Sequence, residues 1–303
     1  MTQSLVSEAS KNSVTSCHEM RWSLPYMSLS GLHWPANTPS PRHPPVIMLH
    51  GWLDNSLSFT HLAPGLQDFA DVYAVDMAGH GLSDHRPLGQ SYQLADYVAD
   101  LAVLIDSEFE QPVDLVGHSL GGIVAMLYAA AFPEKVRKLV MIDSLGPISK
   151  GADDVVGQLR KSIGKRIAGS GRSARYKTVA DAAKAREGGL SPLSHQAAMT
   201  LVPRNLKPVN GGFEWRTDAR LRHPSAMVYA EFQAVSILQT VTTDTLLILA
   251  ENGLLSHLKS WQSRLEVVPS FKQVVVPGSH HCHLDGDAAP VTAAIREFLF
   301  HEL

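Results

Sequence analysis

A serine with a glycine two positions away on each side is the first candidate for chemistry in this chain. Residues 117–121 form the pattern Gly-x-Ser-x-Gly, with Ser119 at its centre. A mostly apolar run over residues 113–116 precedes it, and a helical pattern over residues 123–132 follows at once. This order predicts a sharp strand-to-helix turn that exposes a nucleophilic hydroxyl above a sheet. The flanking glycines are expected because larger side chains would collide around a strained serine. The alternative is an ordinary glycine-rich turn, which the flanking strand and helix disfavour.

A serine nucleophile needs a histidine that takes its proton. Three histidines follow the last predicted strand: His280, His281 and His283. We assign His280, at the strand-to-loop turn, as the general base. His283 is the alternative, or lines the pocket, and His281 is expected to point outward. Three histidines so close along one turn rarely converge on one ion, and no other ligand set accompanies them, so we predict no metal site.

The third group of such a site is a carboxylate that accepts from the histidine and fixes its tautomer. Asp143 ends the predicted strand at residues 139–142 and is our assignment. The other usual location follows the strand predicted at residues 246–249, where the chain has Glu251 and Asn252. Asn252 is uncharged and a poor substitute, and Glu251 stays the alternative acid. Without a catalytic role, Asp143 would be a helix cap or a loop anchor.

Hydrolysis through serine also needs two N–H donors for the oxyanion of the tetrahedral intermediate. One is the backbone N–H of the residue after the nucleophile, here Leu120. The sequence His-Gly-Trp at residues 50–52 follows the buried run Val46–Leu49 and offers a tight turn with Trp52 as the second donor. Taken alone, this turn would be an ordinary one with a buried aromatic side chain.

Six short apolar runs are predicted to form the strands that position these residues. They are Val46–Leu49 and residues 72–75, 113–116, 139–142, 246–249 and 273–276. Continuous apolar runs are typical of strands buried on both faces, which indicates a mostly parallel sheet covered by helices. Helical patterns lie at residues 92–109, 123–132 and 288–303, and edge strands are predicted within residues 20–34. The candidate groups follow strand ends, where ligands bind in open α/β sheets.

The alternation of strands and helices stops between residues 149 and 236. That stretch has helical patches at residues 178–186 and 225–238, so we predict a helical cap over the strand ends. We divide the chain into a polar tail at 1–18, a core at 19–145 and 236–303, and a cap at 146–235.

Composition limits the class of protein. The 303 residues are 45% hydrophobic and 18% charged, which is ordinary for a globular enzyme. The formal net charge of −3 argues against nucleic acid or an anionic membrane as the main partner. No apolar run approaches the roughly 20 residues that span a bilayer. The N-terminus has no secretory pattern and Cys17 and Cys282 form no disulfide framework, which favours the cytoplasm. For the oligomeric state, a monomer and a homodimer both stay open.

These motifs together resemble the α/β-hydrolase superfamily, from about residue 20 to the C-terminus apart from the insertion. Residues 76–84 resemble its Asp-x-x-Gly-His-Gly-x-Ser loop. More narrowly, residues 50–55 and 277–284 look like the serine hydrolase-like proteins, as residues 201–205 do less specifically. The resemblance implies an α/β-hydrolase fold with a mostly parallel sheet flanked by helices. Some haloalkane dehalogenases have their acid where Asp143 lies, but they use an aspartate nucleophile, so dehalogenation is disfavoured.

The expected activity is therefore hydrolysis of a carboxylic ester or similar acyl compound, a small-molecule substrate, through Ser119, His280 and Asp143 without a cofactor. The same three residues would serve C–C bond hydrolysis, lactone opening or perhydrolysis. A ligand-binding protein that keeps the fold without turnover is the remaining alternative, and its usual signature is a damaged set of catalytic residues.

Overall fold

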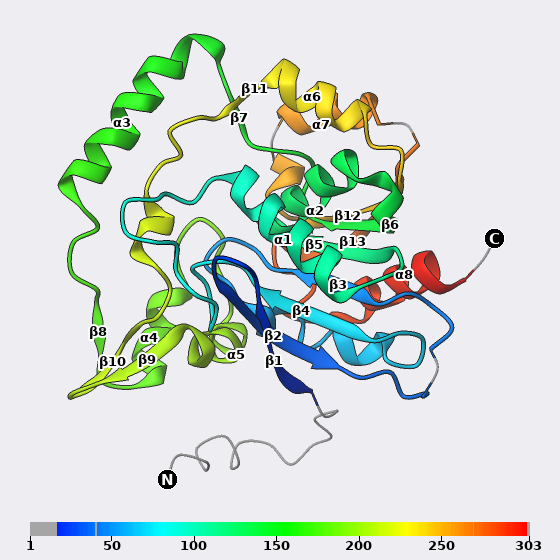
Figure 1. Ribbon diagram of the computed structural model, residues 1–303, viewed down its shortest axis with the longest axis horizontal. Helices are drawn as coiled ribbons and strands as arrows, with labels where there is room; N and C mark the ends of the chain where they lie inside the picture. The colour runs from blue at the N-terminus through cyan, green and yellow to red at the C-terminus, as the bar shows by residue number, and fades with distance from the viewer. Residues whose placement is uncertain (1–16, 40, 258, 269, 302–303) are drawn as a thin grey trace.

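The computed structural model describes residues 17–39, 41–257, 259–268 and 270–301. Its central sheet has eight strands in the order β1-β2-β4-β3-β5-β6-β12-β13 (Figure 1). Strand β2 pairs antiparallel with β1 and β4, and the pairs from β4 to β13 are parallel. The strands are β1 (His18–Ser23), β2 (Ser28–Trp34), β3 (Val46–Leu49), β4 (Val72–Asp76), β5 (Val113–His118), β6 (Val136–Ile142), β12 (Asp244–Asn252) and β13 (Lys272–Ser279). The predicted mostly parallel sheet with antiparallel edge strands is confirmed, whereas residues 1–16 of the predicted tail lie outside the described residues.

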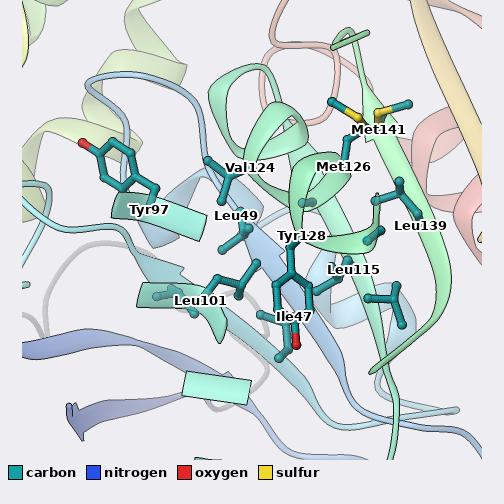
Figure 2. Packing of buried hydrophobic residues seen from close by; sticks show 14 of the residues in the cluster. Ile47, Leu49, Tyr97, Leu101, Leu115, Val124, Met126, Tyr128, Leu139 and Met141 are labelled. Atoms are coloured by element: carbon teal, nitrogen blue, oxygen red, sulfur yellow. The ribbon is translucent and has the colours of Figure 1, made fainter. Parts of the chain in front are cut away.

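Helices cover both faces of this sheet, as the continuous apolar runs predict. On β3, Ile47 and Leu49 pack in a cluster with α1 and α2, whereas Val46 and Met48 pack in another with α8. Figure 2 shows the first cluster, where side chains of both helices meet those of the strands. The helices are α1 (Leu94–Glu108), α2 (Leu120–Ala131), α7 (Lys259–Glu266) and α8 (Ala289–Phe300), with 3-10 turns η1 (Ser56–Phe59), η2 (Ala63–Leu66), η3 (Pro133–Lys135) and η6 (Leu255–His257). The alternation follows from the two-residue period of a strand.

The segment between β6 and β12 lies beside the sheet and holds its own elements (Figure 1). They are β7 (Ser149–Lys150), η4 (Ala152–Asp154), α3 (Val155–Ala168), β8 (Arg175–Tyr176), α4 (Val179–Arg186), α5 (His195–Asn205), β9 (Leu206–Val209), β10 (Gly212–Trp215), η5 (Ala219–Arg222), β11 (Tyr229–Ala230) and α6 (Glu231–Gln239). The helix predicted at 178–186 appears as α4, and the one predicted at 225–238 begins only with α6.

A small antiparallel sheet in this segment was not predicted. Its strands lie in the order β8-β10-β9. The signal was the dipeptide Asn210-Gly211 between β9 and β10, which suits a two-residue hairpin turn because Gly211 has a φ of 83°. The segment is thus helical with a hairpin added. Within the described part of the chain, no helix is both long and apolar enough to cross a membrane.

Two buried histidines near the strand ends make the fold sensitive to acid. His50 donates from Nδ1 to the Gly51 carbonyl oxygen, 2.8 Å away, and accepts the Met77 N–H at Nε2, 3.0 Å away. Burial lowers the pKa of His50 to about 4. Burial and then repulsion from His50 lower the pKa of His80 to about 3. Both rings are therefore neutral in the folded chain at neutral pH.

We expect the free energy of unfolding to fall by at least about 2 kcal/mol between pH 7 and pH 5. The unfolded chain, where histidine has a pKa near 6.5, binds protons in this interval that the folded chain does not. Stability is therefore complete above about pH 6.5 and is lost as the pH falls toward 4. Urea denaturation over a pH series measures this loss. His80→Gln should reduce the slope, the exposed His301→Gln should not, and a pH-independent free energy would contradict the account.

Candidate active site

Three strand ends carry the non-glycine residues with a left-handed backbone in the described ranges. Leu53 has a φ of 65°, Ser119 of 51° and Asp143 of 43°. They lie after β3, β5 and β6, which are neighbours in the sheet. A side chain with this backbone costs about 1–3 kcal/mol and persists where the surroundings hold it, most often at functional sites. The strain therefore gathers at the sheet edge where the sequence predicts a nucleophile, an acid and an oxyanion loop.

The turn that carries Ser119 depends on its glycine neighbours. A side chain at Gly117 would overlap the backbone of Gly121, and one at Gly121 would overlap the Leu49 carbonyl. Two hydrogen bonds fix the turn: the Ser119 N–H donates to the Ile142 carbonyl at 3.2 Å, and its carbonyl accepts from the Ser144 hydroxyl at 2.8 Å. Ser119 is therefore held directly after the carboxyl end of β5. It is partly exposed, as the sequence predicts for a nucleophile.

Asp143 and His280 meet beside this turn. His280 donates from Nδ1 to Asp143 Oδ2 over 2.6 Å, and both side chains are buried. The same oxygen accepts the Leu254 N–H at 2.8 Å. Any side chain at Gly253 would overlap the Asp143 carboxylate, so this loop closes tightly on the acid. Within the described residues no hydrogen bond uses Nε2 of His280, the nitrogen with which a general base takes a proton.

The alternative acid lies elsewhere. Glu251 and Asn252 are exposed at the end of β12, and neither forms a hydrogen bond to His280 among the described residues. The loop that follows these two residues instead donates a hydrogen bond to Asp143 from the Leu254 N–H. Sequence reasoning treated this loop only as a rival acid site and missed its contribution of Gly253 and Leu254.

Four consecutive residues of the loop after β3 are each bonded to the segment between β6 and β12. Trp52 Nε1 donates to the Leu221 carbonyl at 3.0 Å, and the Leu53 carbonyl accepts from Asn205 at 3.0 Å. The other two bonds are Arg186 to Asp54 Oδ1 at 2.9 Å and Asn55 to the Leu201 carbonyl at 2.9 Å. The loop that would carry an oxyanion donor is therefore held in place by the segment between β6 and β12. Two of the four bonds come from Leu201 and Asn205, so residues 201–205 contact this loop.

The two predicted oxyanion donors come from the turn after β5 and from the loop after β3. Leu120 is the first residue of α2, where a backbone N–H has no partner within its helix. In the described ranges, no hydrogen bond uses the Trp52 N–H, and none joins the Ser119 hydroxyl to His280. Catalytic hydrogen bonds are often loose in a free enzyme and tighten with substrate.

His118, His281 and His283 form a buried cluster whose ring centroids lie 4.2 to 6.2 Å apart. His281 is 1% exposed and its Nε2 lies 3.1 Å from Asp54 Oδ2, so the expectation that it points outward is wrong. His283 is bound through Nε2 to the Ser58 hydroxyl at 2.8 Å, and among the described residues no hydrogen bond joins it to Asp143. His118 bonds through Nε2 to the His280 carbonyl at 2.9 Å. No sequence pattern assigned a role to Asp54, Arg186 or His118, although Asp54 lies two residues after the turn at residues 50–52.

Cys282 is not a rival nucleophile. It lies between His281 and His283 and is 1% exposed. Burial, followed by the charge of Asp143, raises the pKa of this thiol to about 12. Because the thiolate is the reactive form, Cys282 is inert at neutral pH.

Arg186→Gln should lower the free energy of unfolding by about 3 kcal/mol, because it leaves the Asp54 carboxylate buried without its cation. The Asp54 side chain is 1% exposed and that of Arg186 is 15% exposed, so solvent replaces little of the lost interaction. Urea denaturation at pH 7.5 measures the change. The matched control is Arg160→Gln, on the exposed surface of α3, which should stay within about 0.5 kcal/mol of the wild type. Equal stability of the two variants would contradict the structural role of this ion pair.

Comparisons with known proteins agree with this architecture. The sequence pattern of the alpha/beta hydrolase fold family matches residues 44–287. A serine hydrolase-like protein of Danio rerio is 33% identical in an alignment of 298 positions that covers 93% of this chain and 88% of the relative. A 2-(acetamidomethylene)succinate hydrolase of Mesorhizobium japonicum is 30% identical over 78% of this chain and 81% of its own length. The crystal structure of a hypothetical protein from Pseudomonas aeruginosa PAO1 superimposes with a TM-score of 0.86 and 39% identity, over 93% of this chain and 98% of that one.

The chain belongs to the alpha/beta hydrolase fold family. Within that family it is similar to the serine hydrolase-like proteins, and a hydrolase activity follows from both relationships.

Proposed function

We propose that the protein hydrolyses a carboxylic ester or a similar acyl compound by way of an acyl-enzyme on Ser119. The observation that carries the proposal is the buried hydrogen bond of 2.6 Å between His280 and Asp143, beside a serine in strained geometry. An acid that holds Nδ1–H leaves Nε2 free to take a proton from a nucleophile. The family relationship supports hydrolysis, and the serine supports acyl chemistry.

The reaction follows from these positions. His280 Nε2 takes the hydroxyl proton as Ser119 Oγ attacks the substrate carbonyl carbon. The resulting oxyanion accepts hydrogen bonds from the backbone N–H groups of Trp52 and Leu120. The carbonyl reforms and the alcohol leaves with the proton from His280. Water then attacks the acyl-enzyme, gives a proton to His280, and releases the acid as Ser119 recovers its proton. Asp143 keeps the imidazole oriented throughout and stays ionised.

The segment at residues 146–235 is assigned as a cap that sets the size of the acyl group and excludes water. Support comes from its bonds to residues 52–55, which join the cap to the proposed oxyanion loop. A substrate that displaces the cap would also disturb this loop, so substrate fit and oxyanion binding are coupled.

A substrate panel tests the proposal. It compares p-nitrophenyl esters of increasing acyl length, thioesters, γ-lactones and a C–C substrate with a β-diketone. Turnover of an ester or thioester with saturation kinetics supports the proposal. Turnover only of the lactone or the diketone would move the assignment to those reactions, which the same three residues could serve. Binding of acyl compounds without any turnover would favour a ligand-binding protein.

A further inference from the structure

Beside the proposed catalytic groups lies a buried set of ligand atoms that the mechanism does not use. It consists of Asp54 in the loop after β3, His118 at the end of β5 and His281 in the turn after β13. One ligand atom from each residue lies within 4.8 Å of those of the other two. The three side chains are 1%, 0% and 1% exposed, so bulk solvent does not solvate these polar groups.

The proton positions leave an acceptor without a partner. His118 Nε2 lies 2.9 Å from the His280 carbonyl oxygen, which can only accept, so Nε2 carries the ring proton. In the neutral imidazole the other ring nitrogen, Nδ1, is then an acceptor without a proton. Within the described ranges this Nδ1 has no hydrogen-bond partner. The Asp54 Oδ2 atom, also an acceptor, is 4.0 Å away.

A cation between these atoms would satisfy them. A tetrahedral zinc ion with bonds of about 2.1 Å holds its ligand atoms about 3.4 Å apart. Asp54 Oδ2 lies 3.1 Å from His281 Nε2 and 4.0 Å from His118 Nδ1, on either side of that value. We propose that Asp54, His118 and His281 bind one divalent transition-metal ion of the zinc type. The ring proton of His281 would move to Nδ1, and a fourth position would stay open for water.

The chemistry of the donors limits which ion fits. Two imidazoles and one carboxylate favour zinc, nickel or copper over magnesium or calcium, which prefer oxygen ligands. Arg186 donates a hydrogen bond to Asp54 Oδ1, which leaves Oδ2 as the oxygen that would bind the metal. Its positive charge also opposes the ion, so binding should be weaker than at a structural zinc site. The prediction of no metal considered only one turn of histidines, whereas Asp54 and His118 come from distant segments.

The position of this site makes its occupancy detectable in the whole protein. His118 precedes Ser119 and His281 follows His280, so one ion would join the two segments that carry these residues. The inference stands apart from the proposed function, because ion binding can be measured whether or not any ester is cleaved. At a zinc concentration of 100 Kd, the melting temperature should rise by roughly 5 °C.

Isothermal titration of the chelator-treated, full-length protein with zinc chloride at pH 7.5 tests the proposal, and cobalt substitution gives an optical signal. We expect one site per chain, visible absorption typical of low-coordinate cobalt, and at least roughly tenfold weaker zinc binding in His281→Gln, because one of three ligands is lost. His195→Gln is the matched control, since His195 is an exposed histidine on α5, outside the cluster. Its affinity should equal that of the wild type.

Two results would overturn the proposal. The first is no zinc binding by the wild type, which would leave the cluster to water and hydrogen bonds. The second is equal affinity in His281→Gln and the wild type, which would place the ion on surface histidines. If His281→Gln does not fold, zinc X-ray absorption of the wild type decides: two imidazoles and one carboxylate support the site, and any other donor set contradicts it.

Discussion

Ser119→Ala should lower kcat for p-nitrophenyl ester hydrolysis by roughly three to six orders of magnitude, because it removes the atom that forms the acyl-enzyme. Residual activity would come from oxyanion binding and orientation alone. The assay compares purified wild type and variant at saturating ester. Stability should change little, because the serine is partly exposed and its hydroxyl has no bond to His280 in the described structure.

The matched control is Ser144→Ala, whose hydroxyl supports the Ser119 carbonyl from 2.8 Å away but is not itself a nucleophile. This variant should keep turnover within about tenfold of the wild type, since it loses one ordinary hydrogen bond. If Ser119→Ala retained wild-type turnover after contaminating esterase was excluded, covalent catalysis at this serine would be wrong.

Asp143→Asn should reduce kcat by roughly 10⁴-fold, the size of effect seen when an amide replaces the acid of a serine triad and the histidine tautomer is lost. The amide nitrogen would donate toward His280 Nδ1, so the proton would move to Nε2 and His280 could no longer act as a base. The amide nitrogen would then stand where Oδ2 now accepts the Leu254 N–H, so this bond would be lost as well. Steady-state kinetics with the best ester of the panel measures the loss.

Glu251→Gln and Asn252→Ala are the matched controls at the alternative acid site. Both residues are exposed at the end of β12, so each change should leave kcat within about threefold of the wild type. A larger loss in Glu251→Gln than in Asp143→Asn would move the acid to position 251.

Much of the framework could be predicted because parallel strands have a strong local signal. Runs such as Val46–Leu49 are apolar on both faces, and the structure buries both. Ser119 could be located because the residues two positions before and after it must be small, and that steric demand is visible in five residues. His280 and Asp143 follow strand ends, and the topology brings such positions to one edge.

What could not be predicted depends on contacts between distant segments. The bond from Arg186 to Asp54 joins residues 132 positions apart, and no local pattern marks it. The burial of His281 was not predicted because its partner, Asp54, lies in the loop after β3, 227 residues earlier in the sequence. The β9–β10 hairpin carried a local signal in Asn210-Gly211, but its strands are too short for periodicity to identify.

The most direct test of the account is the mass of the intact protein after incubation with a fluorophosphonate. The account predicts one phosphonate adduct per chain, located by peptide mapping on Ser119 and formed far more slowly in His280→Gln. Folded protein that gains no adduct, or gains it on another residue, would contradict the assignment of Ser119 as a nucleophile activated by His280 and Asp143.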